Sequence, residues 1–187
     1  MARTASNMIP LQTRAPEFSL MDTVSKKMLS LEQLKGELGT VVFFICNHCP
    51  FVIHVNQELV RMANEYQVHG FSFVAISSND VENYPQDGPE LMEKTAQDQH
   101  YPFPYLYDET QEVARAYDAA CTPDIYLFNE DLRLIYRGQL DDSRPGNGIP
   151  VTGKDLRNAL DAVLQRKPVD TMQKPSLGCG IKWKSFS

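Results

Sequence analysis

Short apolar runs alternate with amphipathic stretches along the chain, and this order is typical of a protein of the α/β class. The run Thr40–Ile45 is continuously β-favouring and apolar, which predicts a strand buried on both faces in the middle of a sheet. Across Cys49–Tyr66 the apolar residues recur every three or four positions, which predicts an amphipathic helix. A second buried strand is expected at Phe71–Ser77. Together these segments predict a βαβ unit with a right-handed crossover.

The rest of the chain predicts a lead-in, more helices and an antiparallel hairpin around that unit. The expected elements are a strand at Phe18–Met21, a helical turn at Leu31–Leu34, a polar loop at 78–88, a helix at Pro89–Gln99, an extended turn at Tyr101–Pro104, a short helix at Asp108–Tyr117, the hairpin strands Ile125–Phe128 and Leu132–Arg137, and a final helix at Thr152–Leu164. This order predicts a central sheet with helices on both faces.

Composition and charge narrow the classes of protein that remain. The chain has 187 residues, of which 42% are hydrophobic and 22% charged, as expected for a globular protein with one packed core. Its formal net charge at pH 7 is −6, and it contains no long run of Lys or Arg. We therefore expect no general attraction to phosphate backbones and no nucleic acid among the partners.

The hydropathy of the chain also argues against a membrane partner. Its longest strongly apolar stretch, Val41–Cys46, is far shorter than the roughly 20 residues that a membrane-spanning helix needs. The first ten residues contain no apolar core of the kind found in a secretory signal. A cytoplasmic location is therefore expected.

The chain contains four cysteines, Cys46, Cys49, Cys121 and Cys179, which are too few for a disulfide scaffold. Cys46 and Cys49 form a C-x-x-C motif where the buried strand gives way to the helix. The free N–H groups and partial positive charge of a helix N-terminus stabilise a thiolate, so Cys46 is predicted to be the attacking thiolate. A protonated His48 would lower the pKa of Cys46 further.

Two other interpretations of these cysteines stay open at this point. A C-x-x-C motif can be half of a zinc site, although Cys121 and Cys179 are widely separated and offer no second pair. The cysteines can also be packed structural residues. No dinucleotide-binding, Walker or Ser/His/Asp pattern is visible, so no cofactor is implied, and no metal ligand is assigned.

Several segments together resemble a known family more specifically than any one alone. They are Ala15–Phe18 and Leu29–Gly36 in the lead-in, Cys46–Pro50 after the buried strand, and Thr122–Pro123 before another strand. This combination resembles the thioredoxin-fold superfamily, in the branch of thioredoxin-like and alkyl hydroperoxide reductase (AhpC/TSA)-like redoxins. The resemblance implies a thioredoxin-like domain over residues 14–165, with a lead-in at 1–13 and a tail at 166–187.

The resemblance also implies roles for individual residues. In this family a Thr-Pro such as Thr122-Pro123 carries a cis peptide bond that faces the C-x-x-C motif, and its exposed backbone pairs with a substrate peptide. Cys46 would attack a substrate disulfide and Cys49 would resolve the mixed disulfide, with Asn47 and His48 in supporting positions. The implied activity is that of a thiol-disulfide oxidoreductase.

Two departures from the family patterns leave other activities open. Thr40 stands where thioredoxins have a buried Asp, so the proton of Cys49 would pass to His48, to water or to an acid such as Glu37. The peroxiredoxin motif P-x-x-x-T/S-x-x-C is unmatched, because Val42 stands at its Pro position and Cys46 at its Thr/Ser position. An antioxidant thiol peroxidase is therefore the alternative enzyme, and a non-enzymatic zinc-binding or partner-binding redoxin module is the third interpretation.

Cys121 and Cys179 are possible additional redox residues. Cys121 precedes Thr122, so it could accept a disulfide from the motif or simply pack as a small apolar side chain. Cys179 lies between two glycines, which give its segment freedom to approach another thiol. The expected partners are a disulfide-containing protein or a small thiol substrate and an unidentified electron donor, and the protein is expected to be a monomer or a homodimer.

Overall fold

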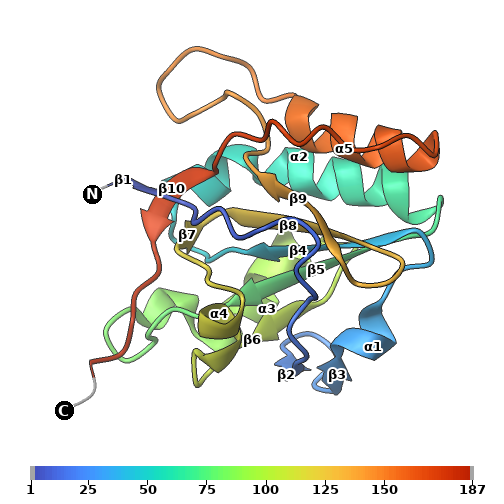
Figure 1. The fold of residues 1–187 in the computed structure, drawn as a ribbon. Helices are drawn as coiled ribbons and strands as arrows, with labels where there is room; N and C mark the ends of the chain where they lie inside the picture. The colour runs from blue at the N-terminus through green and yellow to red at the C-terminus, as the bar shows by residue number, and fades with distance from the viewer. Residues whose placement is uncertain (1–2, 186–187) are drawn as a thin grey trace.

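The computed structural model describes residues 3–185, and it contains a seven-stranded mixed sheet with helices on both faces (Figure 1). The strand order is β3-β2-β6-β5-β4-β8-β9. The strands are β2 (Ser19–Asp22), β3 (Met28–Ser30), β4 (Gly39–Phe44), β5 (Phe71–Ser77), β6 (Tyr105–Tyr107), β8 (Asp124–Asn129) and β9 (Leu134–Gly138). This architecture confirms the predicted α/β class and the central sheet.

Strand β4 lies at the centre of the sheet and every one of its residues is buried. It pairs in parallel with β5 and antiparallel with β8, so that Val42 lies opposite both Val74 and Tyr126. The predicted strand–helix–strand unit is therefore present, and the hairpin of β8 and β9 is antiparallel as predicted.

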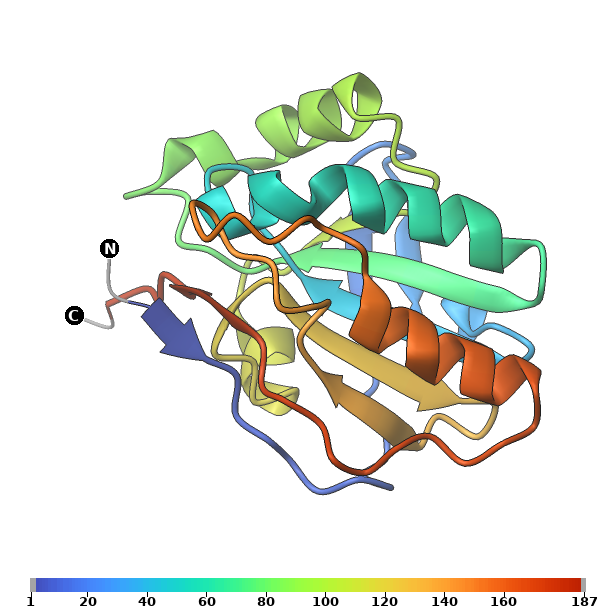
Figure 2. The same ribbon diagram turned by 90° about the horizontal axis from the view of Figure 1, so that it is seen from above.

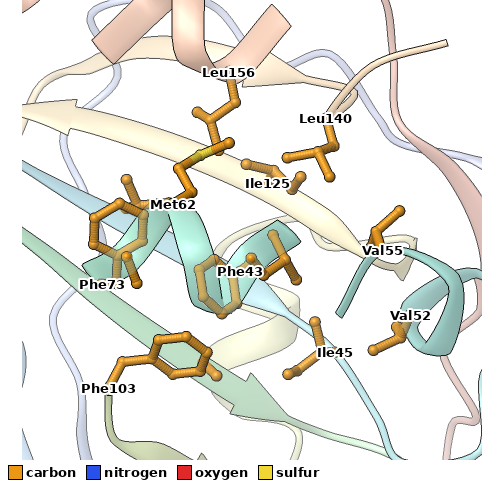
Figure 3. Close-up of a cluster of buried hydrophobic side chains, with 14 of the residues drawn as sticks. Phe43, Ile45, Val52, Val55, Met62, Phe73, Phe103, Ile125, Leu140 and Leu156 are labelled. Atoms are coloured by element: carbon orange, nitrogen blue, oxygen red, sulfur yellow. The ribbon is translucent and has the colours of Figure 1, made fainter. Parts of the chain in front are cut away.

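Successive residues of β4 point to opposite faces of the sheet, and each face has its own core. Phe43 packs with Met62 and Leu156 in the larger core (Figure 3), whereas Val42 and Phe44 belong to the other. The larger core lies beneath three helices that form one layer in Figure 2, and the smaller core lies against two short helices. The first group is α2 (Pro50–Gln67), α3 (Pro89–Asp98) and α5 (Lys154–Leu164), and the second is α1 (Leu31–Leu34) and α4 (Glu112–Ala116).

Three short strands form a second sheet beside the C-terminal end of β4. They are β1 (Arg3–Ala5), β10 (Leu177–Gly180) and β7 (Cys121–Thr122), in the order β1-β10-β7. Both pairings are antiparallel, so β10 is held between the beginning of the described chain and the segment before Pro123 (Figure 1). The sequence predicts no strand at the positions of β1 and β10.

The remaining differences from the predicted elements lie in the connections. The loop 78–88 contains a 3₁₀ helix, η1 (Pro85–Asp87), and β6 follows the proline-rich turn at Tyr101–Pro104. The final helix begins at Lys154, because its N-cap residue Gly153 has a left-handed φ of 66°. Within residues 3–185, no helix combines the length and hydrophobicity that crossing a membrane requires.

Candidate active site

The C-x-x-C motif occupies the turn between β4 and α2. Cys46 follows the end of β4, and Cys49 is the N-cap residue of α2 with Pro50 at the first helical position. Pro fits that position because its missing N–H would have no helical partner. Cys46 is 2% exposed and Cys49 is fully buried, and all four cysteines of the chain are free thiols.

Thr122 contacts both cysteines of the motif from across the sheet. Its hydroxyl oxygen lies 3.6 Å from the Sγ of Cys46, and the Cys49 thiol donates to its carbonyl oxygen over 3.1 Å. The Thr122–Pro123 peptide bond is cis. The structure therefore brings together Cys46, Cys49, Thr122 and Pro123 in the arrangement that the resemblance implies.

The edge of β7 differs from the sequence-based expectation. The backbone of Thr122 is expected to be free for a substrate peptide, but β10 already pairs with it, with Cys179 directly opposite Thr122. The approach is close, because a Cβ on Gly178 would lie 2.0 Å from the carbonyl oxygen of Thr122. The expectation of an open groove at Thr122-Pro123 is therefore wrong, since β10 fills this place.

A buried carboxylate that the sequence-based reasoning missed lies beneath the motif. Asp87, at the end of η1, is fully buried and accepts hydrogen bonds from the backbone N–H groups of Asn47 and His48, at 2.9 and 3.3 Å. It also accepts from the side-chain amide of Asn79, at 2.8 Å, and from Nδ1 of His48, at 2.6 Å. These donors satisfy the carboxylate and fix the turn that carries Cys46.

The two residues between the cysteines are held by the same segment. The ring of His48 stacks on Tyr84, with centroids 5.6 Å apart, and its Nδ1 lies 3.9 Å from the Sγ of Cys46. The side chain of Asn47 donates to the carbonyl oxygen of Gln86 and accepts from the hydroxyl of Tyr105. The side chains of Asn47 and His48 are thus both held by contacts with residues 84–87.

The sequence leaves the acceptor of the Cys49 proton open between His48, water and an acid such as Glu37, and it does not name Asp87. The suggested Glu37 is exposed and lies beside Gly70, at the opposite end of β4 and β5 from the cysteines. The sequence did contain a signal for Asp87. It is an acidic residue in the loop between β5 and α3, and β5 ends beside the motif. Its role depends on the fold of the loop, which local periodicity does not describe.

The two motif thiols share a hydrogen bond, and its direction decides their ionisation. When Cys46 donates to Cys49, that bond raises the pKa of Cys46 well above its usual range, and burial and the Asp87 carboxylate add to the effect. The same bond lowers the pKa of Cys49 to about 5. In this arrangement the charge lies on Cys49, the opposite of the distribution that the sequence predicts.

A second arrangement of the shared proton places the charge on Cys46. The carbonyl oxygen of Thr122 only accepts hydrogen bonds, so Cys49 keeps its proton when it donates to that oxygen. Cys46 is then the sulfur that ionises, with the hydroxyl of Thr122 as a donor. The two thiols therefore titrate as a coupled pair. After the first proton is lost, the remaining proton is shared between the two sulfurs.

Access to the pair is from the side of Cys46. A cavity of about 190 Å³ is lined by Cys46 and Asn47, by residues of α2 and by residues on and just after α3. Cys49 is not among the lining residues. Two side chains of this wall are tied together, since Asn56 accepts from the hydroxyl of Tyr101 over 2.8 Å. A small molecule can therefore meet Cys46 before Cys49.

Three residues of the site also form a set of potential metal ligands. Cys46, His48 and Asp87 each offer one ligand atom, and these atoms lie within 4.8 Å of one another. Thiolate, imidazole and carboxylate are the ligand types of zinc. However, both oxygens of Asp87 already accept hydrogen bonds, so a metal ion would have to replace the 2.6 Å bond between His48 and Asp87.

The two remaining cysteines lie at different places relative to the pair. Cys121 is buried and its Sγ lies 3.7 Å from the carbonyl oxygen of Pro123, and burial raises its pKa well above the usual range. Cys179 belongs to the same buried cluster as Cys46 and Cys49, and its thiol is hydrogen-bonded to Cys49. The structure therefore brings Cys179, rather than Cys121, into the thiol cluster.

Comparison with known proteins finds a matching family and similar structures. The AhpC/TSA family model matches residues 11–137. The chain is 60% identical to an uncharacterised conserved protein from Geobacillus kaustophilus, with a TM-score of 0.98 over 100% of this chain and 99% of that one. It is 46% identical to a hypothetical protein from Sinorhizobium meliloti, with a TM-score of 0.95 over 98% and 100% of the two chains.

More distant structures share the fold. A thiol:disulfide interchange protein of the thioredoxin family from Chlorobium tepidum is 17% identical, with a TM-score of 0.61 over 87% of this chain and all of that one. At this identity the likeness shows a thioredoxin-like fold. No curated protein matches the chain.

Proposed function

Because this chain belongs to the AhpC/TSA family of thioredoxin-like redoxins, we propose that it is a thiol-disulfide oxidoreductase that uses Cys46 and Cys49. One observation carries the proposal. The two free thiols share a hydrogen bond at the N-terminus of α2, and both contact Thr122 at the cis peptide bond. A dithiol that loses its first proton readily is suited to disulfide exchange.

In the first step, Cys46 attacks a disulfide that enters the cavity. A bond forms between the Cys46 sulfur and one substrate sulfur, the substrate disulfide breaks, and the other substrate sulfur leaves as a thiolate. Cys46 is the attacking residue because it lines the cavity, whereas Cys49 does not. Before attack, the shared proton moves to Cys49, where the carbonyl oxygen of Thr122 holds it.

In the second step, Cys49 resolves the mixed disulfide. Its sulfur attacks the Cys46 sulfur, the Cys46–Cys49 disulfide forms, and the second substrate thiolate leaves. The proton of Cys49 passes to that leaving group or to water. The substrate disulfide gains two electrons and the protein dithiol loses them, so an external electron donor must reduce the protein for the next cycle.

The shape of the site bears on the substrate. The backbone of Thr122 is paired with β10, so it does not offer an open edge to a substrate peptide. The cavity of about 190 Å³ is below the range typical of sites for drug-sized ligands. We expect a small disulfide, or an exposed disulfide at the tip of a protein loop, to react in preference to an extended peptide.

Substitution of each motif cysteine tests the proposal. Reduced protein is mixed with glutathione disulfide, and released thiol and covalent adducts are followed by absorbance and mass spectrometry. Cys46→Ser should abolish thiol release. Cys49→Ser should release one equivalent and retain a glutathione adduct on Cys46. Equal residual turnover in both variants would refute these roles, and Cys121→Ser serves as the matched control with unchanged release.

A parallel series with hydrogen peroxide separates the alternative activities. A thiol peroxidase would consume peroxide faster than glutathione disulfide and would form a sulfenic acid on Cys46. A zinc-binding module would be purified with one zinc ion per chain, and its thiols would react with disulfide only after chelation. Either result would overturn the proposed function.

A further inference from the structure

Strand β10 brings a third thiol to the motif. Cys179 pairs directly with Thr122 across the β10–β7 ladder, and residues opposite each other in a ladder place their side chains on the same face. Thr122 in turn contacts Cys46 and Cys49. The register of β10 therefore places Cys179 on the side of the sheet that faces the reactive pair.

The backbone on both sides of β10 holds this register. On one side Gly178 lies against the carbonyl group of Thr122, at a distance that leaves no room for a Cβ. On the other side Cys179 pairs with Arg3 of β1. Just before the strand, the hydroxyl of Ser176 donates to the carbonyl oxygen of Pro123 over 2.6 Å. Cys179 is thus fixed by main-chain contacts and is not at the end of a free tail.

Hydrogen bonds link the three sulfurs in the order Cys46, Cys49, Cys179. Cys49 interacts with both of the other thiols. Cys179 is 3% exposed, and its burial, followed by the hydrogen bond to Cys49, raises its pKa to about 12. Cys179 is therefore a protonated, buried thiol at neutral pH, in contact with the sulfur that becomes the inner half of the Cys46–Cys49 disulfide.

We infer that Cys179 is a third redox residue, which exchanges with the Cys46–Cys49 disulfide to form a buried Cys49–Cys179 disulfide. This inference rests on the proposed function, because the Cys46–Cys49 disulfide is its starting point. The Cys179 sulfur attacks Cys49, the bond between Cys46 and Cys49 breaks, and Cys46 leaves as the thiolate. The proton of Cys179 passes to Cys46. One disulfide and one thiol are present before and after, so the exchange needs no further oxidant.

The exchange has a defined consequence for reactivity. Cys46 becomes a free thiol at the cavity again, while neither cysteine of the new disulfide lines that cavity. An external dithiol cannot reach such a disulfide directly and reduces it only through Cys46. The protein therefore keeps the Cys49–Cys179 disulfide buried while Cys46, at the cavity, is reduced.

Cys121 is the matched alternative and does not share this geometry. It is adjacent to Thr122 in β7, so its side chain points to the other face of the strand. Its Sγ lies 3.7 Å from the carbonyl oxygen of Pro123. It pairs with Gly180, a residue without a side chain. Cys121 therefore provides an internal control for the specificity of the exchange.

Disulfide mapping tests the inference. The reduced protein is oxidised with diamide, free thiols are blocked, and tryptic peptides are identified by mass. Cys46 and Cys49 share the peptide 36–61, whereas Cys179 lies in 167–182. We expect the wild-type protein to give both an internally bridged 36–61 peptide and a 36–61/167–182 cross-link. In the wild-type protein the internal bridge should form first and the cross-link should follow at its expense. Cys46→Ser should give no cross-link, because the starting disulfide cannot form, and Cys46→Ala provides a second variant should the first fail to fold.

The outcomes separate the two claims. An internal disulfide that persists in the wild-type protein without any cross-link to Cys179, or a cross-link that forms equally fast in the Cys46 variants, would overturn the inference and leave the proposed function intact. Absence of the internal disulfide from the wild-type protein would overturn both. A cross-link to Cys121 in place of Cys179 would also overturn the inference.

A pair of glycine substitutions on either side of Cys179 tests the geometry. In Gly178→Ala the new Cβ would meet the backbone of Thr122 at 2.0 Å, so β10 must shift away from β7. We expect the cross-link to form about 100-fold more slowly, as for other oriented reactions displaced by about 1 Å. In Gly180→Ala the Cβ meets the hydroxyl of the Thr4 side chain at 3.1 Å and the carbonyl oxygen of Ala120 at an ordinary 4.0 Å, so the rate should be unchanged. Equal rates in the two variants would contradict the geometric argument.

Discussion

Cys46 and Cys49 are separated by two residues in the chain, yet different segments surround their sulfur atoms. Around Cys46 the contacts are polar side chains, His48 and Thr122, with the Asp87 carboxylate behind them and a cavity in front. Around Cys49 they are a backbone carbonyl oxygen and the thiol of Cys179, in a fully buried position. One sulfur faces the cavity and the other faces the interior of the chain.

This difference shows that a C-x-x-C motif does not set the chemistry of its two thiols by itself. Thr122 of β7 contacts both sulfurs, whereas the segment with η1 supports Cys46 through Asp87 and β10 contributes Cys179 to the surroundings of Cys49. Substitutions in the two segments should therefore have separable effects.

Removal of the buried carboxylate should have the largest effect. In Asp87→Ala, four N–H donors from Asn47, His48 and Asn79 lose their acceptor. We expect the free energy of unfolding to fall by about 3 kcal/mol, measured by urea denaturation, with loss of disulfide reduction. Asp98→Ala, which breaks an exposed ion pair with Lys94, is the control and should change stability little. Comparable losses in both variants would contradict the role of Asp87.

A milder substitution at the same position isolates the charge. The Asp87 carboxylate contributes to the raised pKa of Cys46, so Asp87→Asn should lower that pKa. The rate at which Cys46 reacts with iodoacetamide should then reach its plateau at lower pH than in the wild-type protein. A plateau shifted to higher pH would show that hydrogen bonding by Asp87 outweighs its charge.

The thiol pair itself should titrate unusually. Because the hydrogen bond from Cys46 lowers the pKa of Cys49 to about 5, alkylation of the reduced protein should be nearly independent of pH from 6 to 8. An ordinary thiol would react tenfold faster per pH unit up to about 8.5. Thr122→Val removes a hydroxyl that lowers the pKa of both thiols, so the plateau should move to higher pH.

The same shift affects stability. The unfolded thiol ionises near pH 8.5, so the depressed pKa of Cys49 stabilises the reduced protein above that pH, and this contribution is lost as the pH falls through about 5. The raised pKa values of Cys46 and Cys179 destabilise the reduced protein, and they do so only above about pH 8.5, where the unfolded thiols ionise. Thermal denaturation of the reduced protein should therefore show increasing stability from pH 5 to 8.

The smallest expected effect concerns the stacking of His48 on Tyr84. Tyr84→Leu should lower the free energy of unfolding by about 1 kcal/mol and leave the surroundings of Cys49 intact. Cross-linking between Cys49 and Cys179 should therefore proceed at the wild-type rate. Tyr84→Phe retains the ring and is the control, and a fall in cross-linking in either variant would indicate that the two surroundings are coupled.

Much of the fold follows from local patterns in the sequence. The strand Phe71–Ser77 has the predicted bounds, and α2 begins and ends one residue later than predicted. These elements have strong periodicity or continuous apolar runs, and they contribute to the buried cores. The positions of Cys46 and Cys49 at the junction follow directly from them.

The elements that sequence patterns missed are short and depend on distant partners. Strand β10 has the sequence Leu-Gly-Cys-Gly, which has low β propensity, and it exists because it pairs with β1 and β7. Strand β6 directly follows a proline-rich turn, and η1 lies in a segment without periodicity. The carboxylate and the third thiol of the site come from these elements. The sequence indicates Cys179 as a possible redox residue, but it indicates neither its place beside Cys49 nor any role for Asp87.

The closure of β10 over the site also has a consequence for protein synthesis. A chain emerges from the ribosome with its N-terminal end first, so the motif, α2 and β7 are all released before β10. The pairing of β10 with β1 spans nearly the whole described chain and forms only after that late release. During translation the nascent chain therefore presents Cys49 without its cover, and docking of β10 completes the maturation of the site.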